Sequence, residues 1–268
     1  MAGIVIAKGD GASKFEIGDE VYGNIQDFNA SGKHLKQLGT LAEYVAVEQS
    51  LVALKPPNHS FEEAASLPLA LQTAVQGFET AEFEEEGRSI FVVGGSGGVG
   101  SLVVQLAKRV YGASHVAATT STPKVDFVKG LGASHVVATT CTPKDINENK
   151  GDTKNSFIVA KEEAPIIDIT WPPSHPRAVY SSLTVRGNVL EKLRPYLESG
   201  ELKAIIDPTG PYHFKDVVEA FGHLETGRAR GKVVISPLPS SPWLRPCLLP
   251  RDNPHVTTAT VVQEAAIC

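Results

Sequence analysis

Residues 90–100 read Ile-Phe-Val-Val-Gly-Gly-Ser-Gly-Gly-Val-Gly, and this stretch decides the fold. Its four apolar residues favour an extended strand, whereas residues 99–111 continue with the apolar spacing of a helix. Between them, Gly95, Gly97 and Gly100 have the spacing of a dinucleotide fingerprint, in which glycines permit a tight turn, close approach of a pyrophosphate and close packing of helix on strand. The stretch therefore predicts a strand, a tight turn and a helix whose N-terminus binds phosphate groups.

Two other motifs overlap this glycine turn. Residues 94–98 also satisfy G-x-S-x-G, the nucleophile elbow of α/β-hydrolases, in which Ser96 would be the nucleophile. That alternative leaves Gly100 unexplained, and no HGG-type oxyanion segment lies upstream, so dinucleotide binding is favoured. A P-loop is excluded because it needs Lys and then Ser or Thr after its second glycine, and Ser101-Leu102 follow Gly100.

The composition is that of a soluble globular protein. Of 268 residues, 42% are hydrophobic and 21% are charged, which provides for a sizeable core. A net charge of -5 argues against a nucleic-acid surface, and no apolar run is long enough for a membrane span. The three cysteines, Cys141, Cys247 and Cys268, are too scattered for a disulfide framework or a zinc site, and a reducing compartment fits best. We therefore expect neither a metal, a nucleic acid nor a membrane as a partner.

The patterns along the chain predict an α/β protein with two folded parts. Short strands joined by turns fill residues 1–56 and are typical of a small β-barrel. Ser60 and Glu63 have the spacing of a capping box at the start of a helix. Beyond the glycine turn we expect helices over 157–161, 189–197 and 216–224 and strands over 115–118, 166–169, 205–206 and 232–235. Prolines recur from Pro237 onward, and residues 239–268 are expected to form a disordered tail.

The end of the second predicted strand distinguishes between the two nicotinamide dinucleotides. At this position, about twenty residues past the fingerprint, an acidic side chain binds the ribose 2'-hydroxyl of NAD, whereas hydroxyls and a cation suit the 2'-phosphate of NADPH. Residues 119–124 read Thr-Thr-Ser-Thr-Pro-Lys and contain no carboxylate. Ser121, Thr122 and Lys124 therefore predict NADPH as the cofactor. A similar run at 139–144 indicates that two successive strands of the sheet end alike.

Three motifs together indicate a family. They are the glycine turn at 94–100, the corner Gly-Asp-Glu-Val-Tyr-Gly at 18–23 and the closing run Glu-Thr-Gly-Arg-Ala-Arg-Gly-Lys-Val-Val-Ile at 225–235. With them the chain resembles the zinc-independent medium-chain dehydrogenases/reductases, and among these the plant quinone oxidoreductase-like enzymes of the enone oxidoreductase (2-methylene-furan-3-one reductase) and alkenal reductase type. The resemblance covers roughly residues 2–239.

The resemblance implies a fold and an activity. It implies a Rossmann parallel sheet with helices on both faces over 71–200, and a partial GroES-like β-barrel over 1–70 that is completed by 201–238. Members of the family pass hydride from NADPH to the β-carbon of an α,β-unsaturated carbonyl, or reduce quinones, without a metal. The cofactor contacts that the resemblance implies are Gly98 and Val99 at the pyrophosphate, Ser121, Thr122 and Lys124 at the 2'-phosphate, Thr170 and Ser182 beside the nicotinamide, and Arg228 over the cofactor. No catalytic acid can be assigned.

The chain departs from the family pattern in two places. Residues 1–5 match an internal stretch of the pattern, so several barrel strands are expected to be absent, and most of one family segment is skipped near residues 145–151. A parallel crossover needs at least about 10 to 12 residues, so the skip is expected to remove a central strand. We therefore expect an NADPH-dependent reductase with weak or no turnover. A non-catalytic dinucleotide-binding protein is the alternative, and the resemblance allows a homodimer located in the cytoplasm or in the chloroplast.

Overall fold

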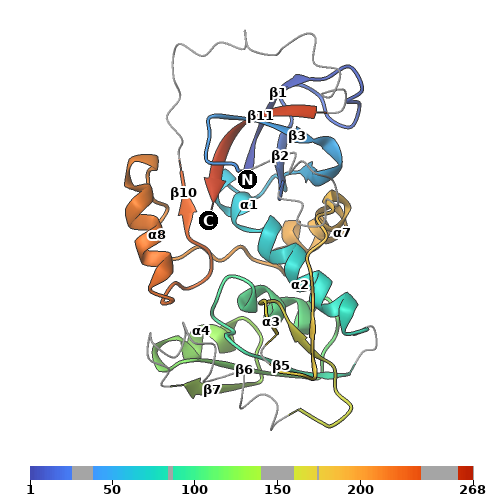
Figure 1. Ribbon diagram of the computed structural model, residues 1–268, viewed down its shortest axis with the longest axis vertical. Helices are drawn as coiled ribbons and strands as arrows, with labels where there is room; N and C mark the ends of the chain where they lie inside the picture. Colours follow the sequence, from blue (N-terminus) through green and yellow to red (C-terminus); the bar gives the residue numbers. More distant parts are fainter. Residues whose placement is uncertain (26–38, 84–86, 140–159, 174, 237–258, 268) are drawn as a thin grey trace.

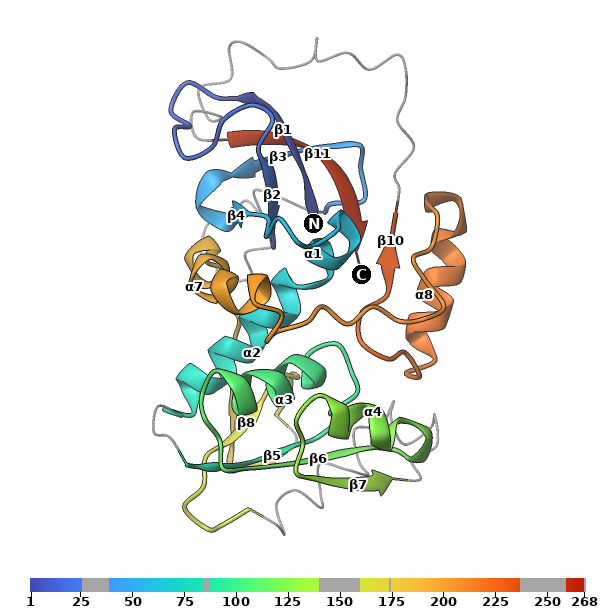
Figure 2. The same ribbon diagram turned by 180° about the vertical axis from the view of Figure 1, so that it is seen from behind.

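The computed structural model describes residues 1–25, 39–83, 87–139, 160–173, 175–236 and 259–267. Figures 1 and 2 show a β-rich part and an α/β part, with helix α2 (Pro68–Thr80) running between them. The structure confirms the predicted α/β class.

The β-rich part is a six-stranded sheet. Its strands are β1 (Ala2–Lys8), β2 (Glu20–Gly23), β3 (Tyr44–Glu48), β4 (Val52–Leu54), β10 (Val234–Ile235) and β11 (Ala259–Ile267). The strand order is β10-β11-β1-β2-β4, and β3 also pairs with β11; a single helical turn, η1 (Gln49–Leu51), joins β3 to β4. Strands β1 to β4, from the first fifty-six residues, and strand β10 share this sheet through β11.

Strand β11 overturns one prediction. The sequence indicated a disordered tail over 239–268, but residues 259–267 form a strand that lies antiparallel to β1, β3 and β10. Residues 237–258 and Cys268 lie outside the described part. The prolines upstream do not prevent the pairing because none of them falls within 259–267.

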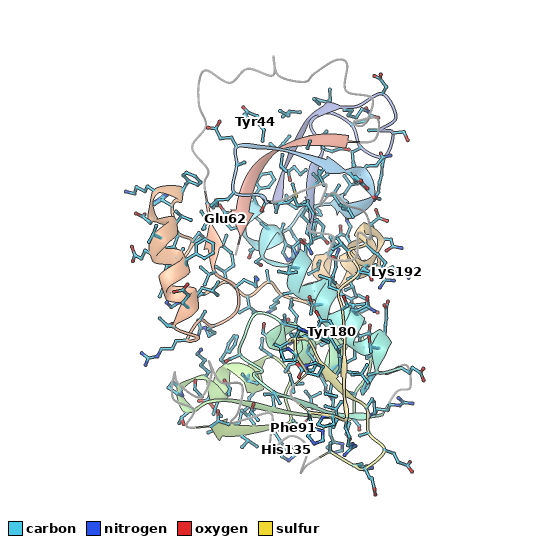
Figure 3. The ribbon with its side chains drawn as sticks, in the orientation of Figure 1. Tyr44, Glu62, Phe91, His135, Tyr180 and Lys192 are labelled. Carbon is cyan, nitrogen blue, oxygen red and sulfur yellow. The ribbon has the colours of Figure 1, made fainter. Side chains whose placement is uncertain are left out.

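Two consecutive helices lead from the β-rich sheet to the α/β part. Helix α1 (Phe61–Ser66) begins with the predicted capping box, in which the Ser60 hydroxyl accepts from the Glu63 amide and the Glu63 carboxylate accepts from the Ser60 amide. Pro68 opens α2, a position where the missing N–H of proline costs nothing. The Ser236 hydroxyl donates to Glu62 at 2.7 Å, which fastens α1 to the end of β10 (Figure 3).

The α/β part contains the predicted strand–turn–helix unit. Strands β5 (Ser89–Val92), β6 (His115–Ser121) and β7 (His135–Thr139) are parallel neighbours in that order. Helix α3 (Gly100–Arg109) connects the first two strands, and the turn η2 (Thr122–Lys124) with helix α4 (Val125–Gly130) connects the last two. Both helices cover the same face of the sheet (Figure 2). The two similar sequence runs are thus the exits of adjacent strands.

The second half of the α/β part is a separate parallel pair, β8 (Ile166–Asp168) and β9 (Ala178–Tyr180). Within the described residues no strand joins β8 to β5. Helices α7 (Gly187–Glu198) and α8 (Val217–Glu225), with the turn η3 (Phe214–Asp216), agree with the expected helices. The strand expected over 205–206 is wrong, since Ile206 forms only an isolated bridge with Lys232. Of the helix expected over 157–161, residues 157–159 lie outside the described part and Lys161 is not helical.

One apolar core extends through both parts. The buried residues of α2 pack together with those of α3, β5, β6 and α7, and the Phe78 ring stacks on Tyr111 with centroids 4.3 Å apart. The expected boundary between residues 70 and 71 falls inside α2. The division into a barrel domain and a Rossmann domain therefore stays a prediction. None of the described helices is long and apolar enough to cross a membrane.

Candidate functional site

Strand β6 fastens the glycine turn at its N-terminal end. Gly94 has a φ of 74°, a conformation that favours glycine, and its amide donates to the Thr119 hydroxyl at 3.0 Å. The next amide, of Gly95, donates to the Thr119 carbonyl at 2.8 Å. The turn is thereby held against the C-terminal end of the parallel sheet, which is where α/β folds bind their ligands.

The three fingerprint glycines have three different surroundings. A Cβ atom on Gly95 would lie 2.9 Å from the Ala118 Cβ, and one on Gly100 would lie only 2.2 Å from the Gly94 carbonyl oxygen. Both positions therefore need glycine for close packing. A Cβ atom on Gly97 would meet only the Gly94 carbonyl oxygen, at 3.4 Å, so packing restricts this position less. The approach of a pyrophosphate to Gly97, which the fingerprint implies, stays a prediction.

Two consecutive amides at the start of α3 have no acceptor among the described residues. They belong to Val99 and Gly100, whereas the Gly98 amide faces the Gly231 carbonyl in the bridge between Gly97 and Gly231. The intramolecular pattern of the helix begins with Ser101, whose amide donates to the Gly97 carbonyl at 3.0 Å. The first turn of α3 carries no acidic residue, and Lys108 and Arg109 lie in its last turn. Unpaired amides at the positive end of a helix dipole attract an anion.

Ser96 is not placed as a nucleophile. Its side chain is buried, and its Oγ accepts a hydrogen bond from the Thr120 hydroxyl at 2.8 Å. A nucleophilic serine needs a general base within hydrogen-bond reach, and no histidine of the described part is bonded to Ser96. The geometry does not support the hydrolase alternative.

Lys124 lies in the turn directly after β6 as expected, and its ammonium already donates hydrogen bonds to backbone carbonyls of the protein. Ser121 and Thr122 are exposed there, whereas the Lys124 ammonium donates to the carbonyls of Arg228 and Ala229 at 2.6 and 3.0 Å. Partial burial lowers the pKa of Lys124, and the nearby Asp207 carboxylate acts in the opposite direction. The structure thus brings together Lys124 and the segment containing Arg228, two sites that the sequence singled out separately.

The segment 228–232 also lies on the glycine turn. The Gly231 amide donates to the Ser96 carbonyl at 2.9 Å, and Gly97 and Gly231 form a bridge of the parallel type. A Cβ atom on Gly98 would lie 2.7 Å from the Lys232 side chain. The Arg228 side chain is exposed. One segment therefore contacts both the glycine turn and Lys124.

Thr170 and Ser182 follow the two strands of the separate parallel pair. Thr170 turns back on its own strand, since its amide and its hydroxyl both donate to Asp168 Oδ1, at 2.9 and 2.7 Å. Ser182 is half-buried between β9 and α7. The role of both residues beside a nicotinamide stays a prediction.

Sequence reasoning missed Asp207. This buried carboxylate accepts from the amides of Thr209 and Arg230 at 2.9 and 2.7 Å, and His223 Nε2 lies 3.2 Å from its Oδ1. Burial opposes ionisation, but these hydrogen bonds outweigh it and lower the pKa of Asp207 to about 2. The available signal was an acidic residue directly after Ile205-Ile206 with threonine two positions later, the pattern of an Asx turn.

Comparison with known proteins identifies relatives of the chain. Residues 111–235 match the family described as zinc-binding dehydrogenase. The 2-methylene-furan-3-one reductase of Solanum lycopersicum is 48% identical over 247 residues, which are 89% of this chain and 63% of that protein. The NADPH-dependent alkenal/one oxidoreductase, chloroplastic, of Arabidopsis thaliana is 45% identical with the same coverage. The quinone oxidoreductase of Coxiella burnetii superposes with a TM-score of 0.70 at 28% identity, covering 87% of this chain and 77% of that one.

The chain is similar to members of the medium-chain dehydrogenase/reductase family, as the sequence motifs indicated. It spans 63% of the length of the two plant relatives. Although the matching family is described as zinc-binding, the described residues contain no group of three His, Cys, Asp or Glu side chains that could hold a metal ion. The side chains described here do not fit a zinc site.

Proposed function

We propose that the protein is an NADPH-dependent oxidoreductase that reduces the C=C bond of α,β-unsaturated carbonyl compounds, or reduces quinones. The names of the two plant relatives support an enone or an alkenal as the substrate, and the Coxiella burnetii structure supports a quinone. Both substrate classes are small conjugated carbonyl compounds that accept a hydride.

The observation that carries the proposal is the fit of the glycine turn to a dinucleotide. The amides of Val99 and Gly100 have no acceptor among the described residues and lie at the N-terminus of α3, and a Cβ atom on the neighbouring Gly97 would meet only the Gly94 carbonyl oxygen, at 3.4 Å. Close by, Ser121, Thr122 and Lys124 offer hydroxyls and a cation where NAD-binding proteins have a carboxylate. These features suit a pyrophosphate and a 2'-phosphate respectively.

The chain contributes binding and orientation to the reaction. When bound, NADPH would supply the hydride. The amides at the start of α3 would hold the pyrophosphate, and Lys124 with Ser121 and Thr122 would hold the 2'-phosphate, so that the nicotinamide is directed towards Thr170 and Ser182. Positioning of this kind can account for a large part of a rate enhancement because it removes the entropic cost of bringing two reactants together. Arg228 would cover the bound cofactor from its exposed loop.

A binding and turnover experiment tests the proposal. Purified wild-type protein is titrated with NADPH and with NADH by nicotinamide fluorescence, and NADPH oxidation is then followed with a small enone and with a quinone. The proposal predicts tighter binding of NADPH and oxidation with at least one of the two acceptors. Failure to bind either dinucleotide would reject it.

A non-catalytic dinucleotide-binding protein is the second candidate. It is favoured by the separation of β5-β6-β7 from β8-β9 in the described part, because a continuous sheet would place the residues after β8 next to the glycine turn. In that case NADPH binds, but neither acceptor is reduced.

We also propose a homodimer and a location. Trp171, Val179 and Tyr180 expose large apolar areas around β9, where Figure 3 labels Tyr180. The ring centroids of Trp171 and Tyr180 lie 5.3 Å apart. Such a patch is typical of a protein–protein contact. A sedimentation experiment showing only monomer would reject the dimer.

The sequence favours the cytoplasm as the location of the protein, whereas the name of the Arabidopsis thaliana relative favours the chloroplast. Imaging of a fluorescent fusion distinguishes the two locations.

A further inference from the structure

Asp207 is buried beside the segment 228–232, which contacts both the glycine turn and Lys124. Asp207 is only 3% exposed, and its side chain accepts hydrogen bonds from the amide and the hydroxyl of Thr209 and from the amide of Arg230. Its own amide donates to the Lys232 carbonyl at 2.8 Å. Asp207 therefore holds the segment 228–232 from two sides.

The same segment holds Lys124. Its carbonyls at Arg228 and Ala229 accept two hydrogen bonds from the Lys124 ammonium, directly before the amide that Asp207 binds. The Arg230 guanidinium lies 4.9 Å from the ring centroid of Phe127, one turn beyond Lys124 on α4. A continuous path of hydrogen bonds thus runs from Asp207 through the backbone of residues 228–230 to Lys124.

This path of hydrogen bonds orients the Lys124 side chain. A lysine side chain loses conformational entropy when it binds an anion, and that loss weakens binding unless the side chain is already ordered in the free protein. An ammonium has three N–H donors, and the described residues provide acceptors for two of them. Within the described part of the chain the third donor has no acceptor, so it is the one that a ligand can use.

We propose that Asp207 is a positioning residue for recognition of the 2'-phosphate: it fixes the backbone of residues 228–230, whose carbonyls orient Lys124. The inference rests on the proposed function, because it assumes that Lys124 binds the 2'-phosphate of NADPH. Asp207 itself does not touch the cofactor. Its effect is specific to the phosphorylated dinucleotide, since NADH has no group at that position for Lys124 to bind.

A double-mutant cycle tests the inference. The variants are Asp207→Asn, Lys124→Ala and the double variant. Asn at 207 keeps an oxygen for Thr209 but presents N–H groups where the Arg230 amide donates. Asp126→Asn is the matched control, because its side chain is 99% exposed and it removes the same charge two residues from Lys124. Binding is measured for NADPH, for NADH and for adenosine 2',5'-bisphosphate, which carries the phosphate without a nicotinamide.

The inference predicts coupling between the two sites. Lys124→Ala should weaken NADPH and the bisphosphate about tenfold to a hundredfold, the range for a charge-assisted hydrogen bond. Asp207→Asn should weaken both about tenfold and leave NADH nearly unchanged, whereas in the Lys124→Ala background it should have little further effect. Asp126→Asn should leave the preference for NADPH as it is. Hydrogen exchange should also become faster at residues 228–231 in Asp207→Asn.

The outcomes separate this inference from the proposed function. If the wild type binds neither NADPH nor the bisphosphate, the proposed function fails and this inference fails with it. If the wild type prefers NADPH, but Asp207→Asn weakens NADH equally or adds its full effect to Lys124→Ala, Asp207 has only a structural role. Should Asp207→Asn not fold, Thr209→Val removes one hydrogen bond to the same carboxylate and must show the same selectivity for the phosphorylated ligands in a smaller degree.

Discussion

At the scale of single residues, Gly100 and Gly231 are positions where a side chain would collide with the backbone. A Cβ atom on Gly100 would lie 2.2 Å from the Gly94 carbonyl oxygen, which is backbone and has no room to move. Gly231 has a φ of 81°, and a Cβ atom there would lie 2.3 Å from the Ile205 carbonyl oxygen. Neither position accepts a side chain without movement of the backbone.

Replacement of Gly100 should therefore be costly. We expect Gly100→Ala to open the turn, to lower the free energy of unfolding by about 1 to 3 kcal/mol, and to weaken NADPH binding at the same time. Gly222→Ala is the control: it lies in α8 with nothing within 4 Å, so it should be neutral or stabilise by up to about 1 kcal/mol. Denaturant unfolding and NADPH titration measure both effects, and a Gly100→Ala protein as stable as the wild type would contradict the packing described.

The carboxylate of Asp207 makes stability depend on pH. Its pKa is lowered from the ordinary value of 3.8 to about 2, so the folded state binds its proton more weakly than the unfolded state does. The stabilisation is fully present above about pH 4 and is lost as the pH falls towards 2. We expect the stability difference between the wild type and Asp207→Asn to shrink over this interval. A difference that is constant between pH 5 and pH 2 in urea unfolding would show that the ionised form has no special role.

The sequence predicts some of these residues and misses others for a physical reason. Gly95 and Gly100 were identifiable because backbone packing requires glycine at a fixed spacing. The charge of Lys124 suggested a phosphate contact, which stays a prediction. Asp207 acts on the backbone amides of Thr209 and Arg230, which every residue except proline possesses. The Asx-turn pattern is a signal for the contact with Thr209, but the Arg230 amide lies 23 residues further along the chain, and only the folded structure shows that contact.

At the scale of elements, the sequence predicted those helices and strands that are marked by a local pattern of apolar residues and glycines. The unit from β5 to α3 and the two strands β6 and β7 follow from apolar periodicity and glycine punctuation. Strand β11 was missed because pairing with β1, β3 and β10 comes from residues far away in the chain. Non-local pairing of this kind leaves no local signal.

The capping box of α1 provides a prediction for an element. Ser60→Ala removes the hydroxyl that accepts from the Glu63 amide at 3.2 Å, and we expect it to lower the free energy of unfolding by about 1 kcal/mol. Ser60→Thr keeps a hydroxyl and should retain most of the stability. Equal unfolding midpoints for Ser60→Ala and the wild type would mean that solvent replaces the cap.

At the scale of the whole molecule, β11 determines whether the β-rich sheet is continuous. It pairs with β1 on one side and with β3 and β10 on the other, so without it the described strands β3 and β10 have no partner in the sheet. Strand edges that are left unpaired expose backbone groups and promote association.

A protein ending at residue 258 should therefore be much less stable. We expect a melting temperature lower by about 10 °C or more, corresponding to several kcal/mol for a chain of this size, together with a tendency to aggregate. Cofactor binding should suffer less than stability, because the glycine turn and α3 are local in sequence. Thermal unfolding of the two proteins side by side measures this, and coincident transitions would refute a structural role for β11.

We propose that the glycine turn and the segment around Lys124 together bind NADPH. The most direct measurement is a fluorescence titration of the purified wild-type protein with NADPH and with NADH under the same conditions. We expect NADPH to bind more tightly than NADH by about tenfold or more, the value of one charge-assisted contact to the 2'-phosphate. Equal affinity for both dinucleotides, or no binding of either, would contradict it.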